Sequence, residues 1–314
     1  MNRHAMAAVV AVGLIASLVM APAHALNTRS FVSGHGIDTN SCALSTPCRT
    51  LAVAYAHTSA GGEIDVLDAA GYGPVTITQA VSIINDGVGT ASILVPPGGV
   101  GIKINAGVND AVTLRGLTIE GAGTGQTGVS FVSGKTLTID GCVIRHVSSD
   151  GIDYFPNGDS NLTVSNTRVA DNREYGILVD PTGSGVVNMV FNRVELTNNG
   201  VIGLYVYGAD STGTLNATVS ESIAAGNENT GFAAFSGVGH APTTLTVFHS
   251  VSANNFAGLA LSGTGAVLRV AQTVVTGNGS GWVVTGSAVL QSYGDNYIDG
   301  NGPNTGALTP ISRR

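Results

Sequence analysis

The stretch GILVDPTGSGVVNMVFNRVELTNN, from Gly176 to Asn199, decides the fold. A glycine opens an alternating apolar segment, and a break containing proline and glycine follows. A second alternating segment reaches Asn192, and Asn198 lies six residues further on. The segment GLYV then starts the same pattern again at Gly203. Alternation of apolar and polar residues is typical of half-buried β-strands, so this stretch predicts short strands separated by tight turns.

Segments of the same kind recur along most of the chain. They begin at Gly101, Gly128, Gly151, Gly176, Gly203, Gly231, Gly258 and Gly281. Successive starts are 27, 23, 25, 27, 28, 27 and 23 residues apart, and each unit holds three short apolar segments without a helical interruption. This repeat predicts an all-β fold, a three-strand parallel β-helix of about nine coils in which each coil is buried by its neighbours. The rule for parallel crossovers makes the winding right-handed.

The alternation also predicts which side chains face the interior. One inward column is Ile102, Val129, Ile152, Ile177, Leu204, Phe232, Leu259 and Trp282. A second inward column is Ile139, Val164, Val190, Val219, Val247 and Val270, and the turns that follow it hold Gly141, Asn166, Asn192, Glu221, His249 and Gln272. Six residues beyond these turns stand Asn172, Asn198, Asn227, Asn255, Asn278 and, in the last coil, Asn301. Because amides stacked on successive coils can hydrogen-bond to one another, we interpret these asparagines as architectural.

The first 25 residues predict a secretory signal peptide. Arg3 precedes the apolar run AMAAVVAVGLIASLVM, and small residues at Ala23 and Ala25 predict cleavage between Ala25 and Leu26. The run is too short for a permanent membrane span, which needs about 20 strongly apolar residues. We therefore expect a secreted or periplasmic protein without stable membrane insertion.

Residues 26–62 predict an N-terminal cap. Cys42 and Cys48 lie six residues apart among turn-forming residues, and in an oxidising compartment they predict a disulfide. Thr46 and Pro47 predict the start of a short helix that ends at Gly61 and Gly62 and covers the open end of the β-helix. The β-helix is expected over residues 63–301 and a C-terminal tail over 302–314. Cys142, inside an apolar pattern, is expected to be a buried, inert thiol.

Composition restricts the partners. Charged residues make up 11% of the chain and the formal net charge is −7. A nucleic-acid binder needs a basic surface, so this class of partner is excluded. We expect a monomer.

The repeated coils, of the form GIxV…LTVSN…V…N, and the opening segment FVSGHGIDTNSC…PCRTL point to a known group of proteins. Together with the signal peptide, they resemble secreted bacterial right-handed parallel β-helix proteins of the pectin-lyase-like superfamily, over about residues 29–301. The resemblance implies a polysaccharide partner and a site on the outward face of the sheet that opens each coil. The negative net charge does not exclude an acidic polysaccharide, because a bridging cation or a local basic patch would suffice. The superfamily includes lyases, hydrolases, epimerases and adhesins, and its calcium-lyase and galacturonan-hydrolase motifs are not recognisable here.

On that face, the outward position of each opening strand is held by Asp65, Lys103, Ser130, Asp153, Leu178, Tyr205, Ala233, Ala260 and Val283. The position two residues further is held by Leu67, Asn105, Val132, Phe155, Asp180, Tyr207, Phe235, Ser262 and Thr285. The turns that enter the middle strands add His146, Asp150, Arg173, Glu174 and Tyr175. The candidate catalytic residues are Asp153, Asp180, Lys103 and Arg173, and the candidates for stacking on sugar rings are Tyr205, Tyr207, Phe235 and Phe155.

Two chemistries are open for these residues. Two carboxylates about a coil apart can act as acid and base in glycoside hydrolysis. Alternatively, the carboxylates hold calcium against a uronate while Lys103 or Arg173 takes a proton, as in a lyase or an epimerase; no other metal or cofactor is expected. The carboxylates can also be plain solvated surface groups. The sequence thus predicts recognition, with cleavage or epimerisation, of an extracellular polysaccharide, and the alternative is a non-catalytic envelope scaffold or adhesin-like protein.

Overall fold

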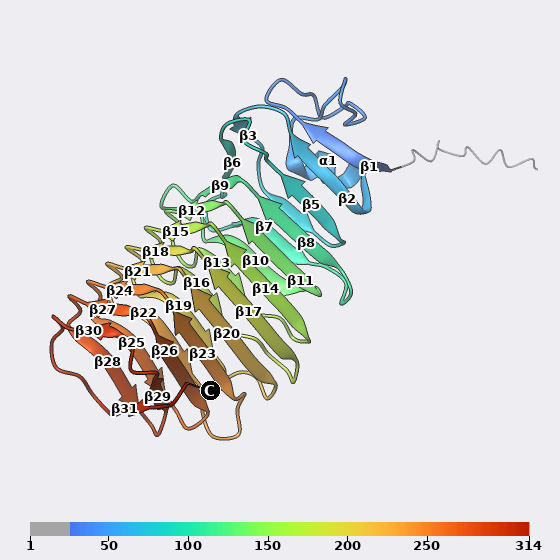
Figure 1. Cartoon of the computed structure of the whole chain (residues 1–314). Helices are drawn as coiled ribbons and strands as arrows, with labels where there is room; N and C mark the ends of the chain where they lie inside the picture. Colours follow the sequence, from blue (N-terminus) through green and yellow to red (C-terminus); the bar gives the residue numbers. More distant parts are fainter. Residues whose placement is uncertain (1–25, 314) are drawn as a thin grey trace, which may run out of the picture.

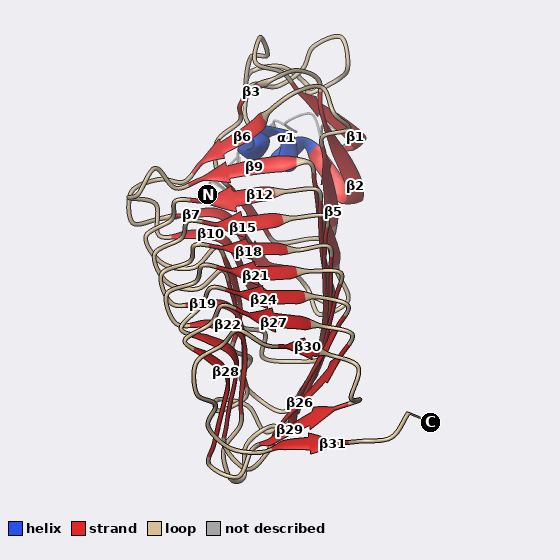
Figure 2. Ribbon diagram, turned by 60° about the vertical axis from the view of Figure 1, so that its left-hand side comes forward, coloured by secondary structure: helices blue, strands red, loops and turns tan. Residues whose placement is uncertain are grey.

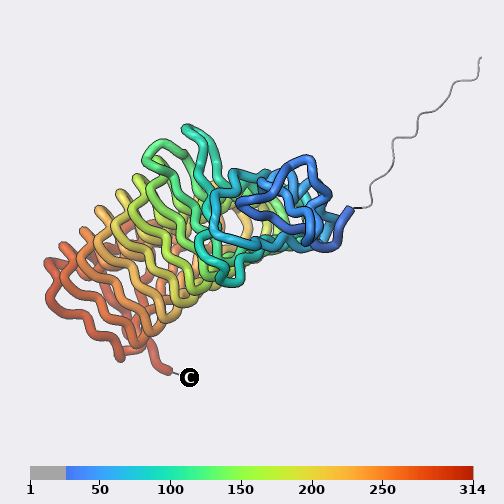
Figure 3. The backbone as a smooth tube through the Cα atoms, turned by 90° about the horizontal axis from the view of Figure 1, so that it is seen from above, coloured from blue at the N-terminus to red at the C-terminus, as the bar shows by residue number. Residues whose placement is uncertain are grey.

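The computed structural model describes residues 26–313, which form a rod of stacked coils (Figure 1). Figure 3 shows the coils side by side along the rod, with the N-terminal part of the described chain at one end and the C-terminus at the other. The predicted signal peptide lies outside the described residues, and so does Ala25 at its predicted cleavage site. Within residues 26–313, no helix has both the length and the apolar character that crossing a membrane requires.

The described residues form three parallel sheets; Figure 2 shows the ten-stranded sheet facing the viewer, with the other two on either side of it. The twelve-stranded sheet contains β1 (Asn27–Val32), β2 (Thr58–Val66), β5 (Val81–Ile84), β8 (Ala111–Arg115), β11 (Thr136–Asp140), β14 (Ser160–Ser165), β17 (Val186–Asn192), β20 (Thr214–Ser220), β23 (Thr243–Phe248), β26 (Ala266–Ala271), β29 (Val289–Ser292) and β31 (Leu308–Pro310). The nine-stranded sheet contains β4 (Val75–Ile77), β7 (Val100–Asn105), β10 (Thr127–Ser133), β13 (Ile152–Tyr154), β16 (Ile177–Val179), β19 (Ile202–Tyr207), β22 (Thr230–Phe235), β25 (Ala257–Ser262) and β28 (Ser280–Thr285). The ten-stranded sheet contains β3 (Ala70–Gly71), β6 (Ala91–Leu94), β9 (Leu117–Glu120), β12 (Val143–Arg145), β15 (Arg168–Ala170), β18 (Glu195–Thr197), β21 (Ile223–Ala225), β24 (Val251–Ala253), β27 (Val274–Thr276) and β30 (Tyr297–Ile298). The predicted three-strand parallel solenoid is confirmed.

The first predicted inward column fills the interior behind the nine-stranded sheet. Val129 pairs with Ile102 on one side and with Ile152 on the other, and all three side chains are fully buried. The column continues in register to Leu259, also fully buried. Trp282, on the last strand of this sheet, is only half-buried because no further strand covers it.

The glycine that opens each coil is explained by the closeness of the coils. A Cβ atom on Gly176 would lie 2.6 Å from the carbonyl oxygen of Gly203 and 2.8 Å from the side-chain nitrogen of Asn199. Both distances are shorter than van der Waals contact, so a side chain here would force the coils apart.

One coil departs from the predicted register. In β17 the buried residues are Val187, Met189 and Phe191, whereas Val190 is 46% exposed. Phe191 pairs with Val164 and Val219, so it takes the inward position predicted for Val190. The prediction was wrong because Asn192 was taken as the turn residue, whereas the left-handed backbone conformation falls one residue later, at Arg193 (φ 52°).

The same one-residue error displaced one member of the predicted asparagine column. Asn199 is fully buried and belongs to the column, whereas Asn198 is exposed. The buried amides form a continuous ladder along the rod. Each side-chain nitrogen donates to the Oδ1 of the next asparagine, at 3.0 Å from Asn172 to Asn199, 3.0 Å to Asn227, 3.0 Å to Asn255, 3.0 Å to Asn278 and 2.9 Å to Asn301. The architectural role of this column is confirmed.

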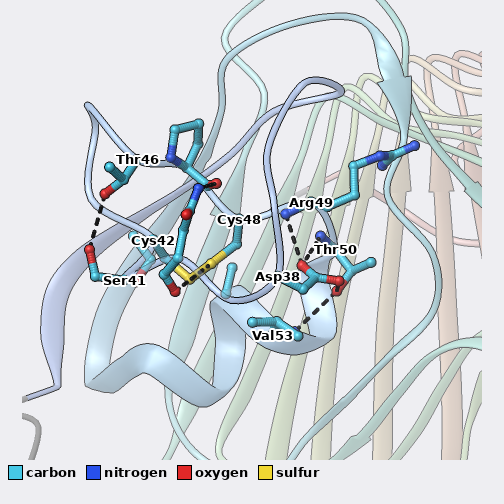
Figure 4. Close-up of a disulfide and its surroundings, with 12 residues drawn as sticks. Asp38, Ser41, Cys42, Thr46, Cys48, Arg49, Thr50 and Val53 are labelled. Carbon is cyan, nitrogen blue, oxygen red and sulfur yellow. Dashed lines mark hydrogen bonds between the residues drawn. A yellow bond between two sulfur atoms is a disulfide. The ribbon is translucent and has the colours of Figure 1, made fainter.

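The N-terminal end of the rod holds the helix α1 (Leu51–His57). Its N-cap is Thr50, whose hydroxyl accepts a hydrogen bond from the backbone of Val53, and β2 follows directly after the helix. The predicted start at Thr46 and the predicted end at Gly61 and Gly62 were therefore wrong. Figure 4 shows that Asp38 accepts hydrogen bonds from the backbone N–H groups of Arg49 and Thr50, at 2.8 and 2.9 Å, and from the Thr50 hydroxyl at 3.1 Å, so it holds the capping residue Thr50 in place.

The loop before the helix is closed by the predicted disulfide between Cys42 and Cys48 (Figure 4). Both cysteines are fully buried. Cys142 is also buried and is a free thiol, and burial raises its pKa to about 12. A thiol with such a pKa is inert at neutral pH, as predicted.

The twelve-stranded sheet extends into segments where no coil was predicted. β1 lies within the predicted cap and pairs with β2, and β31 lies within the predicted tail and pairs with β29. The C-terminal segment also covers part of the open end, because the indole N–H of Trp282 donates to the carbonyl oxygen of Gly306 at 3.1 Å.

Candidate functional site

The outer face of the nine-stranded sheet carries the outward column almost as predicted. Lys103, Ser130, Asp153, Leu178, Tyr205 and Ala233 occupy neighbouring positions on successive strands. Asp65 does not belong to this column. It lies in β2 of the twelve-stranded sheet, where its carboxylate forms an ion pair with Arg29. In the nine-stranded sheet, Thr76 of β4 takes the position next to Lys103.

Three carboxyl groups gather in the middle of this face, and we call Asp150, Asp153 and Asp180 the carboxylate cluster. Asp150 precedes β13, is 7% exposed, and accepts hydrogen bonds from the Tyr175 backbone at 3.1 Å and from the Ser149 hydroxyl at 3.2 Å. Asp153 lies within β13, and Asp180 directly follows β16 on the next coil. Because Asp153 pairs with Leu178, Asp180 stands one strand across and two residues along, a diagonal of about 7–8 Å between Cα atoms.

Burial without a cationic partner changes the protonation of the cluster. Burial, together with the charges of Asp150 and Asp180, raises the pKa of Asp153 to about 7. Burial raises the pKa of Asp150 to about 6, and burial with the charge of Asp210 raises that of Asp180 to about 6. Near neutral pH the cluster therefore holds both a proton and negative charge, the combination that acid–base catalysis by two carboxyl groups requires.

An aromatic row continues from the carboxylate cluster along the rod. The ring centroids of Tyr175 and Tyr205 are 5.8 Å apart, those of Tyr205 and Tyr207 are 5.4 Å apart, and those of Tyr207 and Phe235 are 5.1 Å apart. The last pair is stacked, with an angle of 16° between the ring planes. The row keeps its rings partly exposed and brings them to one surface from β19, β22 and the turn before β16.

Beyond the aromatic row lies a trough of about 210 Å³. Tyr205 and Phe235 form one side, and its floor includes Ala233, Ala260 and Ser262. In the sequence these small residues only continue the outward columns of the nine-stranded sheet. They form a depression because small outward side chains lie next to the large rings of the aromatic row. We call the carboxylate cluster, the aromatic row and this trough together the acid–aromatic face.

The other predicted site residues are placed differently. Lys103 is exposed and is separated from Asp153 by the strand that carries Ser130, about 10 Å at the usual strand spacing. Phe155 is half-buried directly after β13, and its backbone N–H donates to the carbonyl oxygen of Phe131 at 3.0 Å. Phe155 is thus close to the carboxylate cluster in the chain, but it is not part of the aromatic row.

Arg173 and His146 line a separate hollow of about 790 Å³, together with Asp171 and Glu228. His146 contacts Glu120 through Nδ1 at 2.9 Å. His146 and Arg173 lie in the turns that lead from the ten-stranded sheet to β13 and to β16 of the nine-stranded sheet. Sequence spacing showed that these turns enter the middle strands, but it could not show that their side chains point to a different hollow.

Within residues 26–313, no group of three or more His, Cys, Asp and Glu side chains has the arrangement that would hold a metal ion.

The chain matches one known protein family. Residues 100–280 match the family described as the right handed beta helix region. The chain belongs to this β-helix family. The matched residues run from β7 to the start of β28 and include the carboxylate cluster and the aromatic row.

Solved structures show the same β-helix fold at low sequence identity. The structure of XylC in complex with xylose is 8% identical, with a TM-score of 0.55 over 86% of this chain and 70% of that one. Pectate lyase Pel9A is 16% identical, with a TM-score of 0.51 over 90% of this chain and 77% of that one. The alginate lyase from Paenibacillus sp. str. FPU-7 is 12% identical, with a TM-score of 0.51 over 90% and 100%. No curated protein sequence matches this chain.

Proposed function

We propose that this β-helix protein binds an extracellular polysaccharide along its acid–aromatic face and hydrolyses glycosidic bonds there. The observation that carries the proposal is the order of side chains on successive strands: Asp153, then Asp180, then Tyr205 and Tyr207, then Phe235. Adjacent strands are about 4.8 Å apart, so a sugar chain lying along the rod would meet a new side chain at each coil.

The aromatic row supports binding of sugar rings. Tyrosine and phenylalanine offer large, rigid apolar faces, and a tyrosine adds a hydroxyl that can hydrogen-bond. Tyr205 and Phe235 also border the trough, whose alanine floor leaves room for a ring beside them. A pyranose that stacks in this way would place its neighbour in the chain toward the carboxylate cluster.

The carboxylate cluster supports hydrolysis. Asp153, with a pKa of about 7, would hold the proton that it donates to the glycosidic oxygen. Asp180, with a pKa of about 6, would supply the carboxylate that faces the same glycosidic bond from the opposite side to Asp153. Elimination or epimerisation would need a base, and the distant positions of Lys103 and Arg173 give those reactions less support.

The fold is compatible with this class of substrate. Two of the similar structures are named as polysaccharide lyases and one holds xylose, and we extend only the substrate class, a saccharide, to this protein. We also propose that the protein is exported and acts as a monomer. The predicted signal peptide supports export, and so does the disulfide between Cys42 and Cys48, a bond that persists in oxidising compartments.

A panel of plant, algal and bacterial polysaccharides tests this proposal with the purified protein. Hydrolysis yields new reducing ends, whereas a lyase yields unsaturated uronates that absorb ultraviolet light. Asp153→Asn should lower hydrolysis by about 10²–10⁴-fold because the proton donor is lost, whereas Asp86→Asn, at an exposed carboxylate, should not.

Tyr205→Ala should weaken binding by about three- to tenfold through the lost stacking. Tyr297→Ala is the matched control, because Tyr297 is 75% exposed on β30, in a different sheet. Binding to no member of the panel, and no product from any, would contradict the proposal and favour the non-catalytic scaffold.

A further inference from the structure

The acid–aromatic face carries negative charge without basic side chains to balance it. Within residues 26–313, no ion pair closer than 4 Å involves any member of the carboxylate cluster. The charges that act on Asp153 come from Asp150 and Asp180, and the charge that acts on Asp180 comes from Asp210. Glu174 adds a further carboxylate at the edge, 3.2 Å from the Ser149 hydroxyl.

One acceptor in this cluster also lacks a donor. The Oδ1 atom of Asp180 is buried and has no hydrogen-bond partner in the described structure. Buried polar atoms in native proteins are nearly always hydrogen-bonded, because an unsatisfied one is destabilising. A ligand that donates a hydrogen bond to the Asp180 carboxyl group would supply the missing partner.

The basic groups that could receive an acidic sugar lie elsewhere. Lys103 is two strands from Asp153, and Arg173 lines the separate hollow beside Asp171 and Glu228. A uronate on the acid–aromatic face would therefore place its carboxylate against like charges without an arginine or lysine to compensate. Like charges brought together in a partly buried site are strongly unfavourable.

We infer that the glycan bound on the acid–aromatic face carries free amino groups, as in a polymer of hexosamine, and is not a polyuronate. This inference rests on the proposed function, whose substrate class it makes specific. An ammonium group supplies positive charge and three donors to the carboxylate cluster. The neighbouring tyrosine rings add attraction for a cation through their faces, and the aromatic row and alanine floor hold the sugar rings themselves.

Three matched hexasaccharides test the inference by titration calorimetry at pH 6 and low salt. They are the β-1,4-linked hexamers of glucosamine, glucose and glucuronic acid, which share ring and linkage and differ in charge. The glucosamine hexamer should bind about tenfold or more tightly than the glucose hexamer, a difference of about 1.4 kcal/mol. The glucuronic acid hexamer should bind more weakly than the glucose hexamer. Raising the salt concentration should weaken only the binding of the glucosamine hexamer by severalfold.

Variants separate charge from stacking. Asp180→Asn should lower the affinity for the glucosamine hexamer toward that for the glucose hexamer, and Asp86→Asn should leave both unchanged. Tyr205→Ala should weaken the binding of both hexamers by a similar factor. A variant that no longer folds would be detected by its circular dichroism spectrum, and Asp150→Asn then provides the second charge variant, because the pKa of Asp150, like that of Asp180, is about 6.

The outcomes distinguish this inference from the proposed function. Equal affinity for the glucosamine and glucose hexamers would overturn the inference and leave the proposed function standing. Preferred binding of the glucuronic acid hexamer would also overturn it, and a preference that appears only with added calcium would favour the calcium-bridged alternative. If none of the three hexamers binds and no polysaccharide of the wider panel binds or is cleaved, both the inference and the proposed function are rejected.

Discussion

The side-chain amide of Asn199 donates a hydrogen bond to Oδ1 of Asn227 at 3.0 Å, inside the rod, where both residues are buried. Asn199 also donates to the carbonyl oxygen of Val169 and accepts from the amide of Asn172. Asn199→Ala would leave these buried partners unsatisfied, so we expect the free energy of unfolding in urea to fall by about 2–4 kcal/mol.

The control for this prediction is the adjacent residue. Asn198 is exposed and has a φ of 56°, a conformation that glycine adopts freely. Asn198→Gly should therefore change the free energy of unfolding by less than about 1 kcal/mol. Equal destabilisation by the two substitutions would show that the ladder does not run through Asn199.

The register of β17 predicts opposite effects at two neighbouring residues. Phe191 is fully buried, and Phe191→Ala should lower the free energy of unfolding by about 3–5 kcal/mol through the cavity it leaves. Val190 is 46% exposed, and Val190→Ala should change it by about 0.5 kcal/mol or less. Urea unfolding of both variants measures the difference, and a larger loss at Val190 would restore the register that the sequence pattern predicts.

The closeness of the coils predicts that an opening glycine cannot be enlarged. Gly176→Ala would place a methyl group 2.6 Å from the carbonyl oxygen of Gly203, so we expect a loss of about 1–3 kcal/mol in stability. Gly158→Ala is the matched control, because a Cβ atom there meets nothing within 4 Å. Thermal unfolding should separate the two variants by several degrees, and identical melting temperatures would contradict the coil spacing.

The raised pKa of Asp153, about 7, predicts how stability depends on pH. Below about pH 4 its carboxyl group is protonated in both the folded and unfolded states, so it carries no penalty. As the pH rises to about 7, the unfolded chain releases this proton while the folded protein keeps it, and the free energy of unfolding falls. Asp153→Asn removes this loss. The free energy of unfolding of this variant, relative to that of the wild type, should therefore increase by on the order of 1–3 kcal/mol when the pH is raised from 5 to 8.

Urea unfolding of the wild type, Asp153→Asn and Asp86→Asn at both pH values measures this gain. The Asp86→Asn variant controls for the loss of one negative charge at an exposed position. If the difference between Asp153→Asn and the wild type is the same at pH 5 and pH 8, Asp153 is not a buried, protonated carboxyl group.

Most of the fold could be predicted because a solenoid repeats its local rules. Alternation around each opening glycine places Ile152 and Ile177 inside, and the same reading holds in every coil of that column as far as Leu259. The pattern failed where two readings differ by one residue, as at Asn192 and Arg193, because only the backbone conformation tells which residue makes the turn. It also failed at the helix, where the N-cap is Thr50, held by hydrogen bonds to Asp38 twelve residues earlier in the chain.

The candidate site was predicted fully along the strands but only in part in the turns, where Asp150 and Tyr175 belong to it. Asp153, Asp180, Tyr205, Tyr207 and Phe235 follow from strand alternation, and the structure brings them to one face. Arg173 and His146 lie in turns, where alternation does not fix the direction of a side chain. The alanine-floored trough depends on the contrast between neighbouring coils, which a column of single residues does not reveal.

A crystal structure of the protein in complex with an oligosaccharide tests most directly whether the acid–aromatic face is the binding site. The account predicts sugar density along the outer face of β13, β16, β19 and β22, with one ring against Tyr205 and a glycosidic oxygen within hydrogen-bond distance of Asp153. Sugar density confined to another surface, such as the hollow lined by Arg173 and His146, would contradict it.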